Sequence, residues 1–251
     1  GIVGADSSTH LIEATRDLAW QLNLWHSVDP VEKPLDSLWI THSHHGHIDG
    51  LGLFGREVIN SNNLQVNCSK SLAKLIKNTP NWNLLLKLKN IYLNELENLK
   101  SYTPTANCGF SIKPIQVPHR AELSDMHAFL IQGPNKNLLF LPDHDSWENT
   151  LKFVNKTEIL EWFEDENIDI ALIDGTFWSS DELKQRNQKV VIHPPIIETL
   201  QLIGEKKEGM PEIKFTHLNH TNPLNHKDSN EYLTLKKMGW SISKEGEIFT
   251  L

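Results

Sequence analysis

Four histidines and one aspartate fall within eight residues, at His42, His44, His45, His47 and Asp49. They directly follow the apolar segment 38–40, which has the composition of a buried strand. Imidazole nitrogens and carboxylate oxygens are ligands that zinc, manganese and iron accept in proteins. Alternation along an extended chain places His42 and His44 on one side, and His47 returns from the first turn of the next element. The spacing therefore predicts a metal site whose groups converge on one ion or divide between two.

The segments that must position these residues are short and of two kinds. Apolar segments bounded by Pro, Asn, Gly or Asp predict strands at 37–41, 64–68, 110–117, 127–132, 137–141, 168–174, 212–218 and 247–251. Segments with helical periodicity predict helices at 69–77, 83–90, 148–166, 194–206 and 228–238. This alternation indicates an α/β chain whose sheets are covered by helices.

Composition restricts the class of protein. The 251 residues carry 24 Lys and Arg against 32 Asp and Glu, and a formal charge of −8 argues against a general nucleic-acid binder. The 13 His are in excess, whereas two Cys are too few for a disulfide framework or a four-cysteine zinc site. No segment approaches the roughly 20 apolar residues of a membrane span. The sequence begins at Gly1 without Met, so a cleaved signal peptide would leave no trace, and we expect a cytoplasmic location.

The histidine-rich segment resembles the signature of the metallo-β-lactamase fold, which reads His-x-His-x-Asp-His. The threonine before the segment and the Gly-Leu pair after it match that family as well. In this register the resemblance implies three metal ligands, which are His42, His44 and His47. It also places Gly46 where the family has the aspartate that binds a second metal, so that site lacks one ligand.

A second register of the same segment is possible. Reading His45-x-His47-x-Asp49 recovers the aspartate, but it places Gly50 at the last histidine of the signature. We prefer the first register because the predicted strand ends at Thr41 and the Gly-Leu pair then fits. In that register Asp49 or His45 could replace the missing ligand.

The resemblance implies three further ligands in a fixed order, each at the end of a strand. They are a histidine, an aspartate that bridges two metals, and a last histidine. His119 follows Val-Pro at the end of one predicted strand, and Asp143 follows Leu-Pro at the end of another. For the last ligand we prefer His217, because the tRNase Z and phosphodiesterase branches present Thr-His at the close of a strand. His220 is the alternative.

Residues 117–223 also resemble the pyrroloquinoline-quinone biosynthesis protein B family. The resemblance rests on five segments: Val-Pro-His-Arg-x-Glu-x-Ser-Asp (117–125), Gly-Pro-Asn (133–135), Leu-Phe-Leu-Pro-Asp-x-Asp-Ser-Trp (139–147), Leu-Ile-Asp-Gly-Thr-Phe (172–177) and His-Leu-Asn-His-Thr-Asn-Pro (217–223). Before residue 117 the match is weaker, because that family opens with a Gly-rich, Cys-containing stretch that residues 1–35 lack. The first motif of that family also keeps Asp-His and lacks the first two histidines, whereas this sequence has the two histidines and lacks the aspartate. The resemblance therefore supports the fold and the residues that form the pocket more strongly than it supports the reaction.

The resemblance implies a chemistry for these residues. A metal held by two or three neutral histidines and a carboxylate lowers the pKa of bound water and supplies hydroxide as the nucleophile. Asp143 would bridge the metals and orient that nucleophile. His193 resembles a substrate-contacting position of the phosphodiesterase branch and would donate a proton to the leaving group, although a structural role at a helix entry is the alternative. His220 is a further catalytic candidate, and residues expected beside the pocket are Asp49, Asp174, Thr176 and Asn222.

We therefore expect an αββα sandwich of the metallo-β-lactamase type, in one domain over 1–251 without an evident first strand and with a helical insertion at 69–107. The expected function is a metal-dependent hydrolase of a phosphodiester, lactone or related ester, with one or two ions. Zinc is the preferred ion, and manganese and iron are alternatives. The competing hypotheses are an iron-dependent oxidative or accessory enzyme of quinone-cofactor biosynthesis, and a degenerate relative that binds metal or ligand without turnover. The expected partner is a small-molecule substrate rather than a membrane, and a homodimer is compatible with the sequence.

Overall fold

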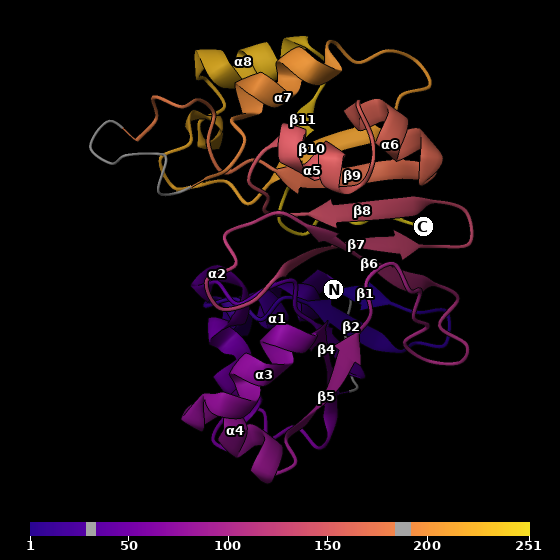
Figure 1. Cartoon of the computed structure of the whole chain (residues 1–251), viewed down its shortest axis with the longest axis vertical. Helices are drawn as coiled ribbons and strands as arrows, with labels where there is room; N and C mark the ends of the chain where they lie inside the picture. The colour runs from indigo at the N-terminus through magenta and orange to yellow at the C-terminus, as the bar shows by residue number, and fades with distance from the viewer. Residues whose placement is uncertain (29–33, 184–191) are drawn as a thin grey trace. The chain divides into compact units, whose positions relative to one another are not determined.

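The computed structural model describes residues 1–28, 34–183 and 192–251. These residues form two compact units, one made of 1–116 and 121–127 and the other of 117–120 and 128–251 (Figure 1). Each unit has its own strands and helices, and each is described by itself.

The sheet of the first unit has the strand order β1-β2-β3-β4-β5. Its strands are β1 (Ile2–Val3), β2 (Thr9–Ile12), β3 (Ser37–Trp39), β4 (Leu64–Ser69) and β5 (Ile91–Leu96). β1 and β2 are antiparallel, and the remaining neighbours are parallel. Because Ile12 pairs with Trp39, the residues that follow β2 and β3 leave the sheet at the same edge.

Helices of the first unit pack on this sheet. They are α1 (Leu18–Val28), α2 (His45–Ile48), α3 (Lys70–Asn78), α4 (Pro80–Lys87) and the 3-10 helix η1 (Asp49–Phe54). The Ser69 side chain accepts a hydrogen bond from the Leu72 amide and so begins α3, and Pro80 stands in the first turn of α4. The core joins strand residues such as Val66 to helix residues such as Leu18 and Leu72.

Five strands of the second sheet lie in or mainly in the second unit, in the order β11-β10-β9-β8-β7. They are β7 (Met126–Gln132), β8 (Asn137–Leu141), β9 (Ile168–Asp174), β10 (Glu212–Thr216) and β11 (Ser241–Ile242), and β6 (Ser111–Val117) precedes them along the chain. β7 and β8 are antiparallel, whereas β8, β9, β10 and β11 run parallel. The ends of β8, β9 and β10 therefore meet at one edge, with Leu141 beside Ile173 and Asp174 beside Thr216.

The helices of the second unit are α5 (Trp147–Phe153), α6 (Ile159–Asp165), α7 (Ile196–Ile203), α8 (Asn230–Lys237) and the 3-10 helix η3 (Pro223–Asn225). α5 and α6 lie beside β9 in Figure 1. Ser146 and Ser229 cap α5 and α8 by accepting backbone N–H bonds. Of the helices assigned in these ranges, none combines the length and apolarity needed to cross a bilayer.

The sequence did not predict β1, β2 or α1, and three predicted segments differ in the structure. The helix predicted at 148–166 is two helices, because the chain turns at Asn155, whose φ is 57°. The strand predicted at 247–251 is not formed, and Ser241–Ile242 pairs with β10 instead. The segment 69–107, expected to be a helical insertion, contains α3 and α4 but also β5, which extends the first sheet beside β4.

Candidate metal centre

Three imidazole rings gather after β3 in the first unit. The His42 ring centroid lies 4.5 Å from that of His44 and 4.2 Å from that of His47. α2 begins at His45 and returns His47 to the other two, as the spacing predicted. His42 Nε2 is 2.9 Å from His44 Nδ1, which is close to the roughly 3.3 Å that separates neighbouring nitrogen ligands on a tetrahedral zinc. His42 and His44 therefore present ring nitrogens at a spacing that one ion accepts.

Glu13 is a buried carboxylate beside these histidines that the sequence interpretation missed. Glu13 Oε1 lies 3.2 Å from His47 Nδ1 and accepts a 2.5 Å hydrogen bond from the Thr41 hydroxyl. The Thr41 oxygen is in turn 2.9 Å from His42 Nδ1. Nδ1 of His42 and of His47 is thus held through Glu13, which leaves Nε2 as the ligand atom of each ring. The available signal was a glutamate directly after the short segment 9–12, which was not recognised as a strand.

The residues of the alternative register bind each other. His45 Nδ1 donates to Asp49 Oδ1 at 2.8 Å, and the His45 side chain is 81% exposed. Arg16 Nε donates to the other oxygen of Asp49 at 2.6 Å. Burial raises the pKa of Asp49, but these two partners outweigh it and the net pKa is lowered. This surface ion pair favours the first register, in which neither residue of the pair is required.

Gly46 stands where the family has its metal-binding aspartate. It lies within the short helix α2 and is exposed. A Cβ built at Gly46 would meet no atom within 4 Å. Packing therefore does not require a glycine at this position.

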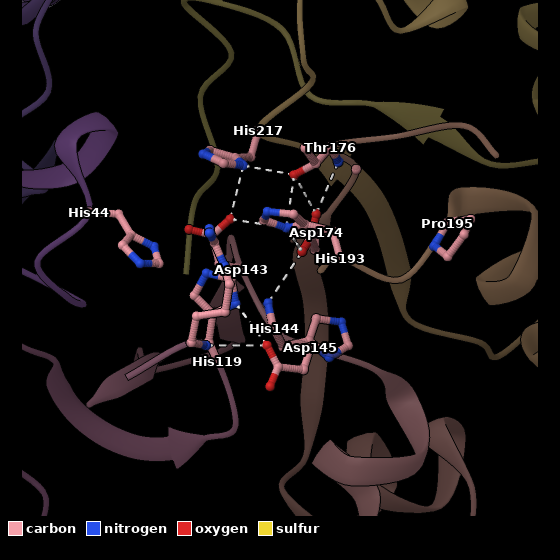
Figure 2. A network of polar contacts seen from close by, with 12 residues as sticks. His44, His119, Asp143, His144, Asp145, Asp174, Thr176, His193, Pro195 and His217 are labelled. Atoms are coloured by element: carbon pink, nitrogen blue, oxygen red, sulfur yellow. Dashed lines mark hydrogen bonds and ion pairs between the residues drawn. The ribbon is translucent and has the colours of Figure 1, made fainter. Parts of the chain in front are cut away.

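The second donor set surrounds Asp143 at the ends of the parallel strands in the second unit (Figure 2). Ligand atoms of His119, Asp143 and His193 lie within 4.8 Å of one another, and so do those of Asp143, Asp174 and His217. The Asp143 side chain is 2% exposed, and its Oδ1 is 3.0 Å from His217 Nδ1. Parallel strands bring their carboxyl ends to one edge of a sheet, which explains how residues so far apart in sequence meet.

His119 is oriented by a carboxylate that the interpretation of the sequence also missed. Asp145 Oδ1 lies 3.3 Å from His119 Nδ1. The Asp145 amide donates to the Pro118 carbonyl at 2.9 Å, and the Arg120 amide donates back to Asp145 Oδ1 at 3.3 Å. A carboxylate on the far nitrogen of a histidine fixes its tautomer and strengthens it as a ligand. Asp145 stood in the motif 139–147, but spacing alone assigned it no role.

Asp174 connects several groups of this site. It accepts hydrogen bonds from the Thr176 hydroxyl at 2.7 Å, from His193 Nδ1 at 2.7 Å and from the His144 amide at 3.2 Å. Burial raises the pKa of Asp174, but the charge and hydrogen bond of His193 outweigh it and the net pKa is lowered. Burial lowers the pKa of His193, and Asp174 more than reverses that effect, so its net pKa is raised. The two form an ionic pair inside the unit.

The structure separates the two candidates for the last ligand. His217 is bound to Asp143 and lies 2.9 Å from the Thr176 hydroxyl through the same Nδ1. His217 and His220 are both exposed, but His220 belongs to none of the metal-competent groups found in the described ranges. Asn222, expected beside the pocket, is fully buried and donates to the Gly175 carbonyl at 2.8 Å. These contacts favour His217 and place Asn222 within the frame of the site.

The chemistry of both donor sets fits a divalent metal that accepts nitrogen and oxygen ligands. Both cysteines are buried, and burial raises the pKa of the Cys68 thiol to about 12. The thiolate that zinc or iron–sulfur sites need is therefore suppressed at Cys68. Imidazole and carboxylate groups of this kind suit zinc, manganese or ferrous iron.

Comparison with known proteins shows which family and which solved structures this chain resembles. A model of the β-lactamase superfamily domain matches residues 9–217. The coenzyme PQQ synthesis protein B of Xanthomonas axonopodis pv. citri is 23% identical, over 94% of this chain and 81% of its own length. The structure of Zn(2+)-bound PqqB from Methylobacterium extorquens has a TM-score of 0.74 at 16% identity and covers 96% of this chain and 83% of that one. A diphosphatase of the PhnP family has a TM-score of 0.61 at 15% identity, with 98% and 82% covered. These matches confirm the predicted fold class.

Proposed function

We propose that this chain, which belongs to the β-lactamase superfamily, is a metal-dependent hydrolase of a phosphodiester, a lactone or a related ester. The observation that carries the proposal is the clustering around Asp143. Within the second unit, two groups of three potential ligands share this buried carboxylate, and Asp143, Asp174 and His217 lie at the ends of β8, β9 and β10. Structural relatives in the same superfamily include a diphosphatase, which supports hydrolysis as the reaction class.

Zinc is the ion we propose, with manganese or iron as alternatives and one or two ions per chain. His42, His44 and His47 of the first unit and His119, Asp143 and His217 of the second are the proposed ligands. A bound divalent ion lowers the pKa of coordinated water to near neutrality and so supplies hydroxide. Asp143 would hold the ion and orient the nucleophile.

His193 is the proposed proton donor to the leaving group. Its Nδ1 is bound to Asp174 at 2.7 Å and lies 3.5 Å from Asp143, so Nε2 is the nitrogen that would exchange a proton with the substrate. The side chain is 5% exposed, which shields this proton from bulk water. General acid catalysis of this kind contributes about 10²- to 10⁴-fold to a rate.

The experiment is hydrolysis of aryl phosphodiesters by the zinc-loaded protein, with two leaving groups of different basicity. His193→Gln should reduce the rate strongly for a phenol leaving group and weakly for p-nitrophenol, because the better leaving group needs less protonation. His226→Gln, an exposed histidine of the same unit, is the matched control and should behave as the parent. An equal loss with both leaving groups would contradict the role of His193, and no metal-dependent turnover of diesters or lactones would contradict the hydrolase.

A second candidate function comes from the relatives. The matched coenzyme PQQ synthesis protein B supports a role in the synthesis of a quinone cofactor, and the activity we propose for that role is an iron-dependent oxidative or accessory one. Elemental analysis of protein purified without a tag separates the two candidates. Zinc or manganese with ester hydrolysis supports the first, and one iron with oxygen-dependent product supports the second. Absence of any metal, with thermal stability unaffected by chelator, would support a non-catalytic relative.

A further inference from the structure

We propose that Asn222 is a positioning residue that holds His217 in the left-handed backbone conformation in which it meets Asp143. The inference rests on the proposed metal site, and it does not depend on which reaction that site performs. It assigns to the Asn222 amide a role in metal binding that is exerted entirely through the backbone.

The starting observation is the backbone of His217. Its φ is 60°, a conformation that residues with a Cβ adopt uncommonly. It follows β10 directly, because Thr216 is the last residue paired with Asp174. In this conformation His217 Nδ1 reaches both Asp143 and Thr176, at 3.0 Å and 2.9 Å (Figure 2). Such a conformation persists only where surrounding contacts over-determine it.

The Asn222 side chain supplies contacts of this kind. Its Nδ2 donates to the carbonyls of Gly175 at 2.8 Å and Thr176 at 3.3 Å. Its Oδ1 accepts from the Leu224 amide at 3.0 Å. The residue is fully buried, so the carbonyls it satisfies have no easy replacement from water. One amide group thus ties the loop after His217 to the segment after β9.

Two backbone bonds close the same loop on either side of His217. The Gly175 amide donates to the Thr216 carbonyl at 2.8 Å, and the Asn219 amide donates to the Thr176 carbonyl at 3.0 Å. Gly175 has no room for a side chain, because its Cβ would lie 2.8 Å from the Thr216 carbonyl. The chain before and after His217 is therefore fixed to residues 175–176, and Asn222 completes this attachment.

An aspartate at 222 would keep the size and the acceptor for Leu224 but could not donate to two carbonyls. A buried carboxylate facing those carbonyl oxygens is also repelled by them. The loop would then move away from residues 175–176, and His217 would relax to a negative φ. Its ring would leave Asp143 and Thr176, and one ligand would be lost without any change to a ligand residue.

The test is the zinc affinity of Asn222→Asp, measured by competition with a chromophoric chelator. Asn225→Asp is the control, because the Asn225 amide also donates to a loop carbonyl, that of Asn219 at 2.9 Å, but is exposed. We expect affinity to fall about 10- to 100-fold in Asn222→Asp and to stay unchanged in Asn225→Asp. Backbone chemical shifts of His217 should change from left-handed to right-handed values in the first variant alone. Unchanged affinity and shifts in a folded Asn222→Asp would overturn the proposal.

A second pair of variants tests the strain without altering Asn222. Glycine adopts a positive φ freely and alanine does not. Metal-free His217→Gly should therefore melt about 2–4 °C above metal-free His217→Ala, although both should lose zinc affinity. Equal melting temperatures would overturn the proposal even if Asn222→Asp failed to fold. Undiminished zinc affinity of His217→Ala would overturn the metal site itself, whereas loss in His217→Ala with none in Asn222→Asp would overturn the positioning role alone.

Discussion

At the scale of single residues, three histidines of the candidate site share one arrangement. A carboxylate lies at Nδ1 of each of three histidines: Glu13 at His47, Asp145 at His119 and Asp174 at His193. These carboxylates fix the tautomer of each ring, and Glu13 and Asp145 would raise the basicity of His47 and His119 toward a metal. Two of them were not predicted from the sequence, because which carboxylate meets which histidine depends on strand register rather than on spacing.

Glu13→Gln should weaken zinc binding about 10- to 100-fold, because the amide cannot accept from both Thr41 and His47 with the strength of a carboxylate. The measurement is zinc affinity by chelator competition. Asp49→Asn is the matched control, since Asp49 also binds a histidine, His45, next to the same turn. A greater loss in Asp49→Asn than in Glu13→Gln would contradict the first register of the histidine motif.

Gly46→Asp should be tolerated, because a Cβ at this exposed position meets no neighbour within 4 Å. The unfolding temperature should stay within about 2 °C of the parent, since surface substitutions of this kind change stability little. Restoring the family's aspartate should raise the metal content of the purified protein toward two ions per chain. Elemental analysis that shows the same metal content in both proteins would contradict the assignment of position 46 as the place of the missing ligand.

At the scale of elements, the strands that carry Asp143, Asp174 and His217 could be predicted because their apolar runs are bounded by polar residues. The β8 and β9 boundaries agree with those predictions, at Asn137–Leu141 and Ile168–Asp174. β2 was missed because its fully buried His10 is polar. Ser37 and Ser8 satisfy its two ring nitrogens at 2.8 Å each, and such side-chain pairing leaves no periodic signal in sequence.

The break between α5 and α6 gives a prediction at this scale. The apolar periodicity runs on across 148–166, but Asn155 has a φ of 57°, which asparagine tolerates better than most residues. Asn155→Ala should lower the free energy of unfolding by about 1 kcal/mol, and Asn155→Gly should not. Urea denaturation measures the difference, with Asn149→Ala at an exposed position of α5 as the control. If Asn155→Ala lowered the free energy of unfolding no more than Asn149→Ala, the turn at Asn155 would not be the cause of the break between α5 and α6.

At the scale of the whole molecule, several histidines are buried in the uncharged form. Burial lowers the pKa of His10, against the opposing charges of Asp36 and Asp6. Burial likewise lowers the pKa of His127, against Asp125, and lowers the pKa of His144 to about 4. The unfolded chain binds more protons than the native one below the ordinary histidine pKa of about 6.5, so stability is lost as pH falls below that value. The sequence shows an excess of histidine, with 13 residues. Only the structure distinguishes the histidines that are buried in the fold from those that are candidate ligands.

The free energy of unfolding of the metal-free protein should therefore fall between about pH 6.5 and pH 5. His10→Gln should reduce this slope by up to about 1.4 kcal/mol per pH unit, the contribution of one proton. Urea denaturation at several pH values measures it, with exposed His26→Gln as the control. An identical slope in His10→Gln and the parent would show that His10 is not buried uncharged.

The account depends most on Asp143, the carboxylate shared by both ligand groups of the second unit. The most direct measurement is zinc binding by the untagged parent and by Asp143→Asn, with circular dichroism to verify that both are folded. The account predicts at least one zinc per parent chain and an affinity at least about 100-fold weaker in Asp143→Asn. Equal zinc affinity in the two folded proteins would contradict it.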